Sequence, residues 1–202
     1  MKTILVVILS AVLIVSLVGC ETLHQWRGRR MAERLYSEEN YQQLAELFET
    51  VEDELEEFIM QMREIDMLYT SELRSIVFPP TGDNLNRYNN LPFSRIIVYE
   101  GEILEEMSTE HYVDTFMNNS ELTNLLKQIS EAGVILSIAF GRWRETEDVR
   151  VEFVINTDFT PFIVGNNNFN NAFFYIESSY EASPSVREIR ENWYMWISPG
   201  PG

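Results

Sequence analysis

Residues 120–140 read SELTNLLKQISEAGVILSIAF, and the spacing of their apolar residues changes at Gly133. Before this glycine, apolar residues recur at helical spacing on one face: Leu122, Leu125, Leu126 and Ile129. We expect a helix over 120–132, which Ser120 can cap, and then a strand over 134–140. Gly133 stands where helices commonly end in a left-handed residue.

A second strand is predicted immediately downstream, over residues 149–155 (VRVEFVI), where apolar and polar residues alternate. Val151, Phe153 and Ile155 should face the core, because alternate residues of a strand point to the same side of a sheet. Residues 142–148 fit the hairpin loop between these two strands. Further strands are predicted over 95–99 (RIIVY), 172–178 (AFFYIES) and 193–197 (WYMWI).

Upstream, residues 31–78 contain neither proline nor glycine and are rich in helix-forming residues. They predict one long acidic helix, with a break near Ser37 as an alternative that would give two. An apolar seam runs along this helix at alternating steps of four and three: Leu44, Phe48, Val51, Leu55, Phe58, Met62, Ile65 and Tyr69. Such spacing is typical of a helix that packs along a narrow stripe.

The surface around this seam is strongly acidic, with eleven acids between Glu38 and Asp66 against one base, Arg63. Coiled coils usually mix charges of both signs beside their seam, and this helix does not. We therefore expect the seam to pack on the chain's own sheet and the head to be monomeric. The alternative is that the seam pairs with a helix of a partner protein.

These elements predict the α+β class: a long N-terminal helix packed on an antiparallel sheet of about 4–5 strands, with one further helix. Residues 31–78 and 92–197 should form one domain. Residues 198–202 (SPGPG) should be a disordered tail, because proline and glycine prevent regular structure there.

The first nineteen residues have the character of an export signal, with Lys2 followed by an apolar run from Ile4 to Val18. The run of about 15 residues is short of the roughly 20 that a membrane-spanning helix needs. It ends in Leu17-Val18-Gly19-Cys20, which resembles the lipobox of bacterial lipoproteins. The resemblance implies cleavage before Cys20, acylation of its thiol, and a mature protein of residues 20–202; no family is recognised for this mature part.

The resemblance also implies a place in the cell: a lipid-anchored protein of the membrane or envelope, outside the cytoplasm, with residues 20–30 as tether. Four arginines follow the apolar run: Arg27, Arg29, Arg30 and Arg34. Under the positive-inside rule they would instead favour an uncleaved anchor with a cytoplasmic head. The short apolar run and the position of Cys20 favour the lipoprotein interpretation.

The composition excludes several function classes. The chain carries 15 Lys and Arg against 32 Asp and Glu, a formal charge of −17, which is unsuited to nucleic-acid binding. Cys20 is the single cysteine, and His24 and His111 are the two histidines. Because nucleophilic catalysis usually needs a base near the nucleophile, we expect no enzyme, and no metal or other cofactor. Asp83 opens a segment that resembles a calcium loop but lacks its glycine and closing glutamate.

One candidate binding loop remains: Asn166, Asn167, Asn168 and Phe169, at the centre of an asparagine-rich segment. An aromatic surface beside it could stack on sugars or peptides, formed by Trp143, Tyr175, Tyr180, Trp193, Tyr194 and Trp196. The sequence thus favours a lipid-anchored, non-catalytic binding or accessory module whose protein or glycan partner is unknown. The alternative is a structural or assembly lipoprotein that pairs through its acidic helix.

Overall fold

The computed structural model describes residues 36–70, 73–88, 94–142, 148–159, 171–177, 180, 183 and 185–197. Residues Glu38–Gly202 form one compact unit, and the fold below is that of this unit. The predicted signal peptide and tether (1–30) and the tail (198–202) lie outside the described residues.

Along the chain, two α-helices come first, three strands follow, two further α-helices come next, and five strands complete the described elements. The α-helices are α2 (Glu38–Glu49), α3 (Glu52–Glu64), α4 (Glu110–Met117) and α5 (Ser120–Ala132). The strands are β1 (Arg74–Val77), β2 (Ser94–Tyr99), β3 (Glu102–Ile103), β4 (Ile135–Arg142), β5 (Val149–Ile155), β6 (Asn171–Ile176), β7 (Val186–Arg190) and β8 (Trp193–Ile197). Short 3₁₀ turns are η1 (Leu85–Tyr88), η2 (Glu105–Met107) and η3 (Thr157–Phe159).

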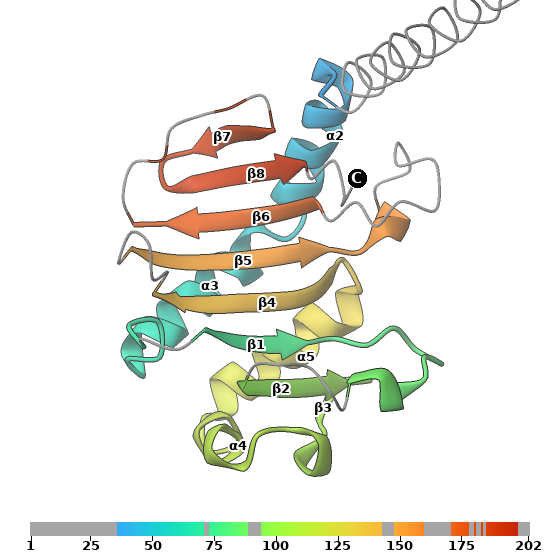
Figure 1. Ribbon diagram of the computed structural model, residues 1–202, viewed down its shortest axis with the longest axis vertical. Helices are drawn as coiled ribbons and strands as arrows, with labels where there is room; N and C mark the ends of the chain where they lie inside the picture. Colours follow the sequence, from blue (N-terminus) through green and yellow to red (C-terminus); the bar gives the residue numbers. More distant parts are fainter. Residues whose placement is uncertain are drawn as a thin grey trace, which may run out of the picture. The chain divides into compact units, whose positions relative to one another are not determined.

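The strands form one eight-stranded sheet in the order β3-β2-β1-β4-β5-β6-β8-β7. Helices α2, α3 and α5 lie on one of its faces (Figure 1). The α+β class is therefore confirmed. The expected sheet of 4–5 antiparallel strands is too small, and it is not wholly antiparallel, because β1 pairs with β2 in parallel.

The predicted long helix over 31–78 is wrong in detail, because its described part forms two helices and a strand. Helix α2 ends where the Thr50 hydroxyl donates to the Leu47 carbonyl oxygen at 2.6 Å and the Val51 N–H donates to Phe48 at 3.0 Å. A threonine that bonds back to its own turn competes with helical continuation. Helix α3 then begins at Glu52, two residues beyond the break.

Helix α3 ends without a glycine, in a turn that residue types alone do not reveal. Asp66 adopts a left-handed conformation with φ of 56°. Its N–H donates to the Arg63 carbonyl at 3.0 Å, and the Met67 N–H donates to the Met62 carbonyl at 2.9 Å. These two bonds are those of a Schellman motif, in which glycine is the usual left-handed residue. The following residues, which we expected to be helical, include strand β1.

Helix α5 and its neighbours agree closely with the sequence pattern. The helix spans Ser120–Ala132, and Gly133 ends it with φ of 66°. Its cap is Asn119 rather than the expected Ser120: the Asn119 side-chain oxygen accepts a hydrogen bond from the Leu122 N–H at 3.1 Å.

The apolar seam of α2 and α3 is buried against the sheet, as expected. From Leu44 to Met62 its residues are each at most 6% exposed. Phe48 lies edge-on to Phe173 with ring centroids 5.2 Å apart, and Phe58 lies edge-on to Phe153 at 5.8 Å. The seam ends with the helix, and Tyr69 beyond it is exposed.

Ion pairs join the acidic helices to the edge of the sheet. Arg187 pairs with Glu38 at 2.5 Å, and Arg190 pairs with both Glu52 and Glu56. These side chains are partly or largely exposed, so each pair contributes at most about 1 kcal/mol. The burial of the seam, rather than these pairs, therefore holds the helices on the sheet.

Polar groups close the outer edge of β2. The Arg95 N–H donates to the Thr109 hydroxyl oxygen at 3.1 Å. Two residues on, the Ile97 N–H donates to the Ser108 hydroxyl oxygen at 2.9 Å. The opposite edge strand, β7, has an irregular register between Glu188 and Arg190. Edge strands whose N–H groups are already bonded, whose register is irregular or whose side chains are charged resist pairing with a further strand. This favours a monomeric head, which stays a prediction.

None of the described helices is both long and apolar enough to cross a lipid bilayer.

The substitution Phe153→Ala should lower the free energy of unfolding by about 3–5 kcal/mol. Phe153 is 0% exposed and lies between Phe58 and Trp193, whose ring centroids are 5.8 and 5.7 Å from its own. Val154→Ala is the matched control, since Val154 is half-buried on the other face of the same strand; it should cost about 1 kcal/mol. Urea unfolding measures both, and a loss below about 1 kcal/mol for Phe153→Ala would mean that the faces of β5 are assigned backwards.

Candidate functional site

The structure describes only some of the candidate residues that were chosen from the sequence. Cys20 lies outside the described residues, as does the asparagine-rich loop with Asn166, Asn167, Asn168 and Phe169. His24 is outside as well, and His111 falls in α4 at a position where the side chain is not described. The lipidation site and the binding loop therefore stay predictions.

The expected aromatic surface is not present on the described part of the sheet. Tyr175, Trp193 and Tyr194 are only 8%, 3% and 4% exposed, so their rings belong to the core. Trp196 is half-buried, and Tyr180 alone among these described rings is exposed, at 42%. Trp143 lies outside the described residues. Strands β6 and β8 have buried residues on both faces of the sheet. Their bulky residues are therefore mostly buried whichever face they point to.

The segment that resembles a calcium loop uses its oxygens for its own turn. One Asp83 carboxylate oxygen accepts the Asn84 N–H at 2.9 Å, and the other accepts the Tyr88 hydroxyl at 2.8 Å. The Asn84 side-chain oxygen accepts the Asn86 N–H at 3.1 Å. The last of these bonds is that of an Asx turn, in which the side chain bonds the backbone two residues on. Within the part of the chain that the structure describes, no three His, Cys, Asp or Glu residues are grouped as metal ligands would be.

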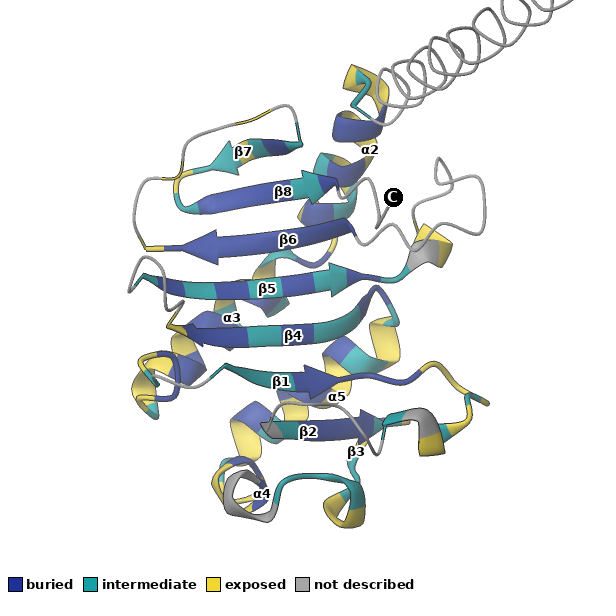
Figure 2. Cartoon of the chain, viewed as in Figure 1, coloured by how far each residue is buried: buried dark blue, intermediate teal, exposed yellow. Residues whose placement is uncertain are grey.

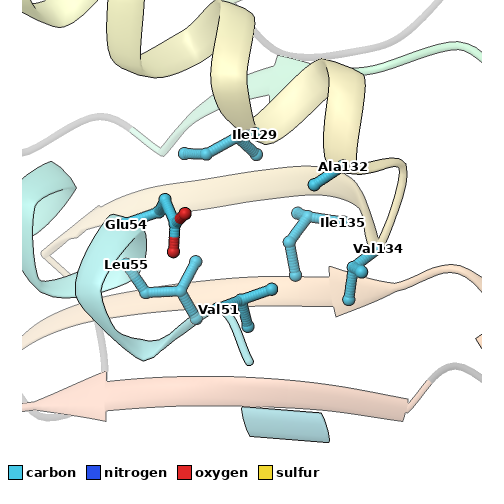
Figure 3. Close-up of a pocket in the computed structure, with 7 residues that line it drawn as sticks. All are labelled: Val51, Glu54, Leu55, Ile129, Ala132, Val134 and Ile135. Carbon is cyan, nitrogen blue, oxygen red and sulfur yellow. The ribbon is translucent and has the colours of Figure 1, made fainter. Parts of the chain in front are cut away.

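A small cavity lies between α3, α5 and the start of β4. Figure 3 shows the residues around it: Val51, Glu54, Leu55, Ile129, Ala132, Val134 and Ile135. Its volume is about 10 Å³, which is room for one water molecule at most. Glu54 is its one charged lining residue. The cavity is therefore a packing defect between two helices and is too small for a sugar or a peptide.

The face of the sheet opposite the helices, here called the helix-free face, has a different character. No described α-helix covers it (Figure 1). The strand register aligns one row of its residues across the sheet, strand by strand: Arg95, Ser75, Ala139, Glu152, Phe174, Tyr194 and Glu188. Charged groups thus flank two small residues in the β2–β5 half of this row. Figure 2 shows that β5 alternates between buried and intermediate residues, whereas β6 is buried throughout.

At the centre of this face, Arg150 and Glu152 form an ion pair. Their closest nitrogen and oxygen are 3.4 Å apart, and the side chains are 17% and 15% exposed. Burial raises the pKa of the Glu152 carboxyl above its ordinary value of 4.5, and the positive charge of Arg150 offsets this only in part. The Arg150 guanidinium lies 4.7 Å from the centroid of the Phe174 ring, in a cation–π contact.

An aromatic cluster lies beside this pair. The rings of Phe174 and Tyr194 stack at 5.3 Å with 15° between their planes, and Tyr180 meets both edge-on. The Tyr194 hydroxyl also accepts a hydrogen bond from the Tyr180 backbone N–H at 3.2 Å. The cluster closes the β6–β8 half of the helix-free face, so the Ser75–Ala139 strip on the other side of Glu152 is the part that a ligand could occupy.

Sequence reasoning did not single out Arg95, Arg150 or Glu152 as site residues. The alternation in residues 149–155 correctly assigns Glu152 to the side away from the helices. Its alignment with Arg95 depends on the order of four strands, which no local pattern encodes.

No protein-family model, curated protein or solved structure matches the chain. No family is thus recognised for the mature domain, as expected from the sequence.

The substitution Glu152→Gln should change how stability depends on pH. Burial disfavours the ionised form of the Glu152 carboxyl in the folded chain relative to the unfolded chain, where the carboxyl is in water. As the pH falls, the folded chain takes up this proton first, because the pKa is raised there. The wild type should therefore gain stability relative to Glu152→Gln as the pH falls from 7 toward 4.5.

Urea unfolding at several pH values measures this difference. Glu188→Gln, at the exposed end of the same row, corrects for the loss of an exposed carboxylate. If the difference in free energy of unfolding between the wild type and Glu152→Gln does not change with pH, or if the wild type loses stability relative to the variant as the pH falls, burial does not disfavour the ionised Glu152.

Proposed function

We propose that this protein is a lipid-anchored lipoprotein of the bacterial cell envelope whose α+β head is a non-catalytic binding or accessory module. The anchoring rests on the Leu17-Val18-Gly19-Cys20 sequence and the short apolar run before it. A diacylated terminus gives stable attachment, whereas a single acyl chain is marginal. The head would then be held outside the cytoplasm by residues 20–30.

The assignment to binding rather than helix-mediated assembly rests on one observation: the seam of α2 and α3 is already used inside the head. Phe48 and Phe58 are 1% and 0% exposed. A partner helix could reach these side chains only after α2 and α3 had left the sheet, which would expose most of the core. A ligand is better accommodated on the helix-free face, where Arg95 and Glu152 flank small residues. The non-catalytic character rests on the sequence, which holds two histidines and one cysteine.

Anchoring is tested by the substitution Cys20→Ser. The variant should no longer incorporate labelled fatty acid and should accumulate as an uncleaved precursor, because the thiol that accepts the lipid is gone. Metabolic labelling with palmitate and gel mobility of the membrane fraction measure both effects. Gly19→Ala keeps a small residue before Cys20 and should behave as the wild type. If Cys20→Ser matures to the same mass as the wild type, the lipoprotein proposal is wrong.

A further inference from the structure

Two small side chains separate the charged residues of the helix-free face. Ser75 of β1 and Ala139 of β4 lie side by side, with Arg95 beyond one and Glu152 beyond the other. Three strand spacings of about 4.8 Å place the Arg95 and Glu152 backbones roughly 14 Å apart. Side chains in strands stand roughly perpendicular to the sheet, so this backbone separation sets the scale of the distance between the two charged ends.

The two small residues of this strip are less buried than the larger residues on either side of them on the same face. Ile97 on β2 and Phe174 on β6 are 0% and 1% exposed on the same face. Ser75 and Ala139, between them, are half-buried although their side chains are among the smallest. The strip thus keeps partial exposure to solvent, whereas the larger residues at both sides are covered.

The charges at the two ends have opposite signs. Among the described residues, Glu152 forms an ion pair with Arg150, and this pairing does not fully offset the effect of its burial. A second cation at Glu152 would be favourable for that reason. Arg95 already has a contact within the chain, but a guanidinium has five N–H donors and can bind a carboxylate as well.

We propose that this strip binds a short peptide with free ends, its ammonium group at Glu152 and its carboxylate at Arg95. The proposal rests on the proposed function and gives the binding module a ligand class. Of the roughly 14 Å available, two charge-assisted hydrogen bonds of about 2.8 Å leave about 8 Å between the peptide's charged ends. An extended chain spans about 3.5 Å per residue, so the ligand is a di- or tripeptide.

The neighbouring row of the same face supplies an apolar contact for the peptide side chains. The register aligns Val77 of β1, Ser137 of β4 and Val154 of β5 next to the strip. A small apolar side chain that points toward this row would contact Val154, which is half-buried, whereas Val77 is buried at 8% exposed. Apolar di- and tripeptides should accordingly bind better than acidic ones, which would also meet the charge of Glu152.

The experiment is a calorimetric titration of the full-length protein, reconstituted in nanodiscs, with trialanine. Its N-acetyl and C-amide forms remove one end charge each, and each should bind about 10- to 100-fold more weakly, the loss expected of one charge-assisted hydrogen bond. In Glu152→Gln, trialanine should bind weakly and N-acetylation should cause no further loss. In Arg95→Gln, amidation should cause no further loss. Glu188→Gln, outside the strip, should bind as the wild type.

Ala139→Val provides a variant that leaves both charges in place. It inserts two methyl groups into the strip on a residue type that strands favour, and it should also weaken trialanine binding about tenfold or more. This variant decides the question even if Arg95→Gln does not fold.

The proposal is overturned if trialanine shows no saturable binding at millimolar concentration, or if N-acetylation weakens binding equally in the wild type and Glu152→Gln. Either result leaves the acylation of Cys20 unaffected, so failure of the peptide site is distinguishable from failure of the lipoprotein proposal.

Discussion

The packing of Phe48 and Phe58 on the aromatic rings of the sheet is the contact on which the rest of this structure depends. Each phenylalanine lies edge-on to a phenylalanine of the sheet, Phe173 and Phe153, on neighbouring strands. Rings of this size bury a large apolar area and add a favourable electrostatic term in this geometry. Without these two rings, the acidic helices α2 and α3 would lose much of the apolar contact that holds them on the sheet. Their ion pairs with the sheet are partly or largely solvent-exposed and stabilise them little.

This contact makes the two faces of the sheet unequal. One face is closed by the chain's own helices and carries the core. The other has no described helix, and there a partly buried ion pair, Arg150–Glu152, lies beside the Phe174 ring. The hydroxyls at the edge of β2 and the irregular register of β7 disfavour further strands. For these reasons, the proposed binding function is assigned to the helix-free face rather than to the seam or the edges.

The fold was predictable from the sequence where a short segment determines its own structure. Helix α5 with Gly133, the alternation of β5, and strand β8 follow from period and residue type. Strand β1 was missed because Asp66, and not a glycine, ends α3, so no breaker residue separates the helix from Ile76 and Val77. Strand β7 was missed because Arg187, Glu188 and Arg190 give an edge strand the composition of a solvated loop. The row from Arg95 to Glu152 was beyond sequence reasoning, since it requires the parallel pairing of β1 with β2.

The most direct test of this account is the reactivity of single thiols on the two faces. With Cys20→Ser as the background, no other cysteine is present, so Leu55→Cys reports on the seam and Ala139→Cys on the helix-free face. In native buffer, a maleimide should label Ala139→Cys at least about 100-fold faster than Leu55→Cys, because a buried thiol reacts only through opening of the fold. In urea the two rates should become equal. Equal rates in native buffer would contradict the account, since the helices would then not close that face of the sheet.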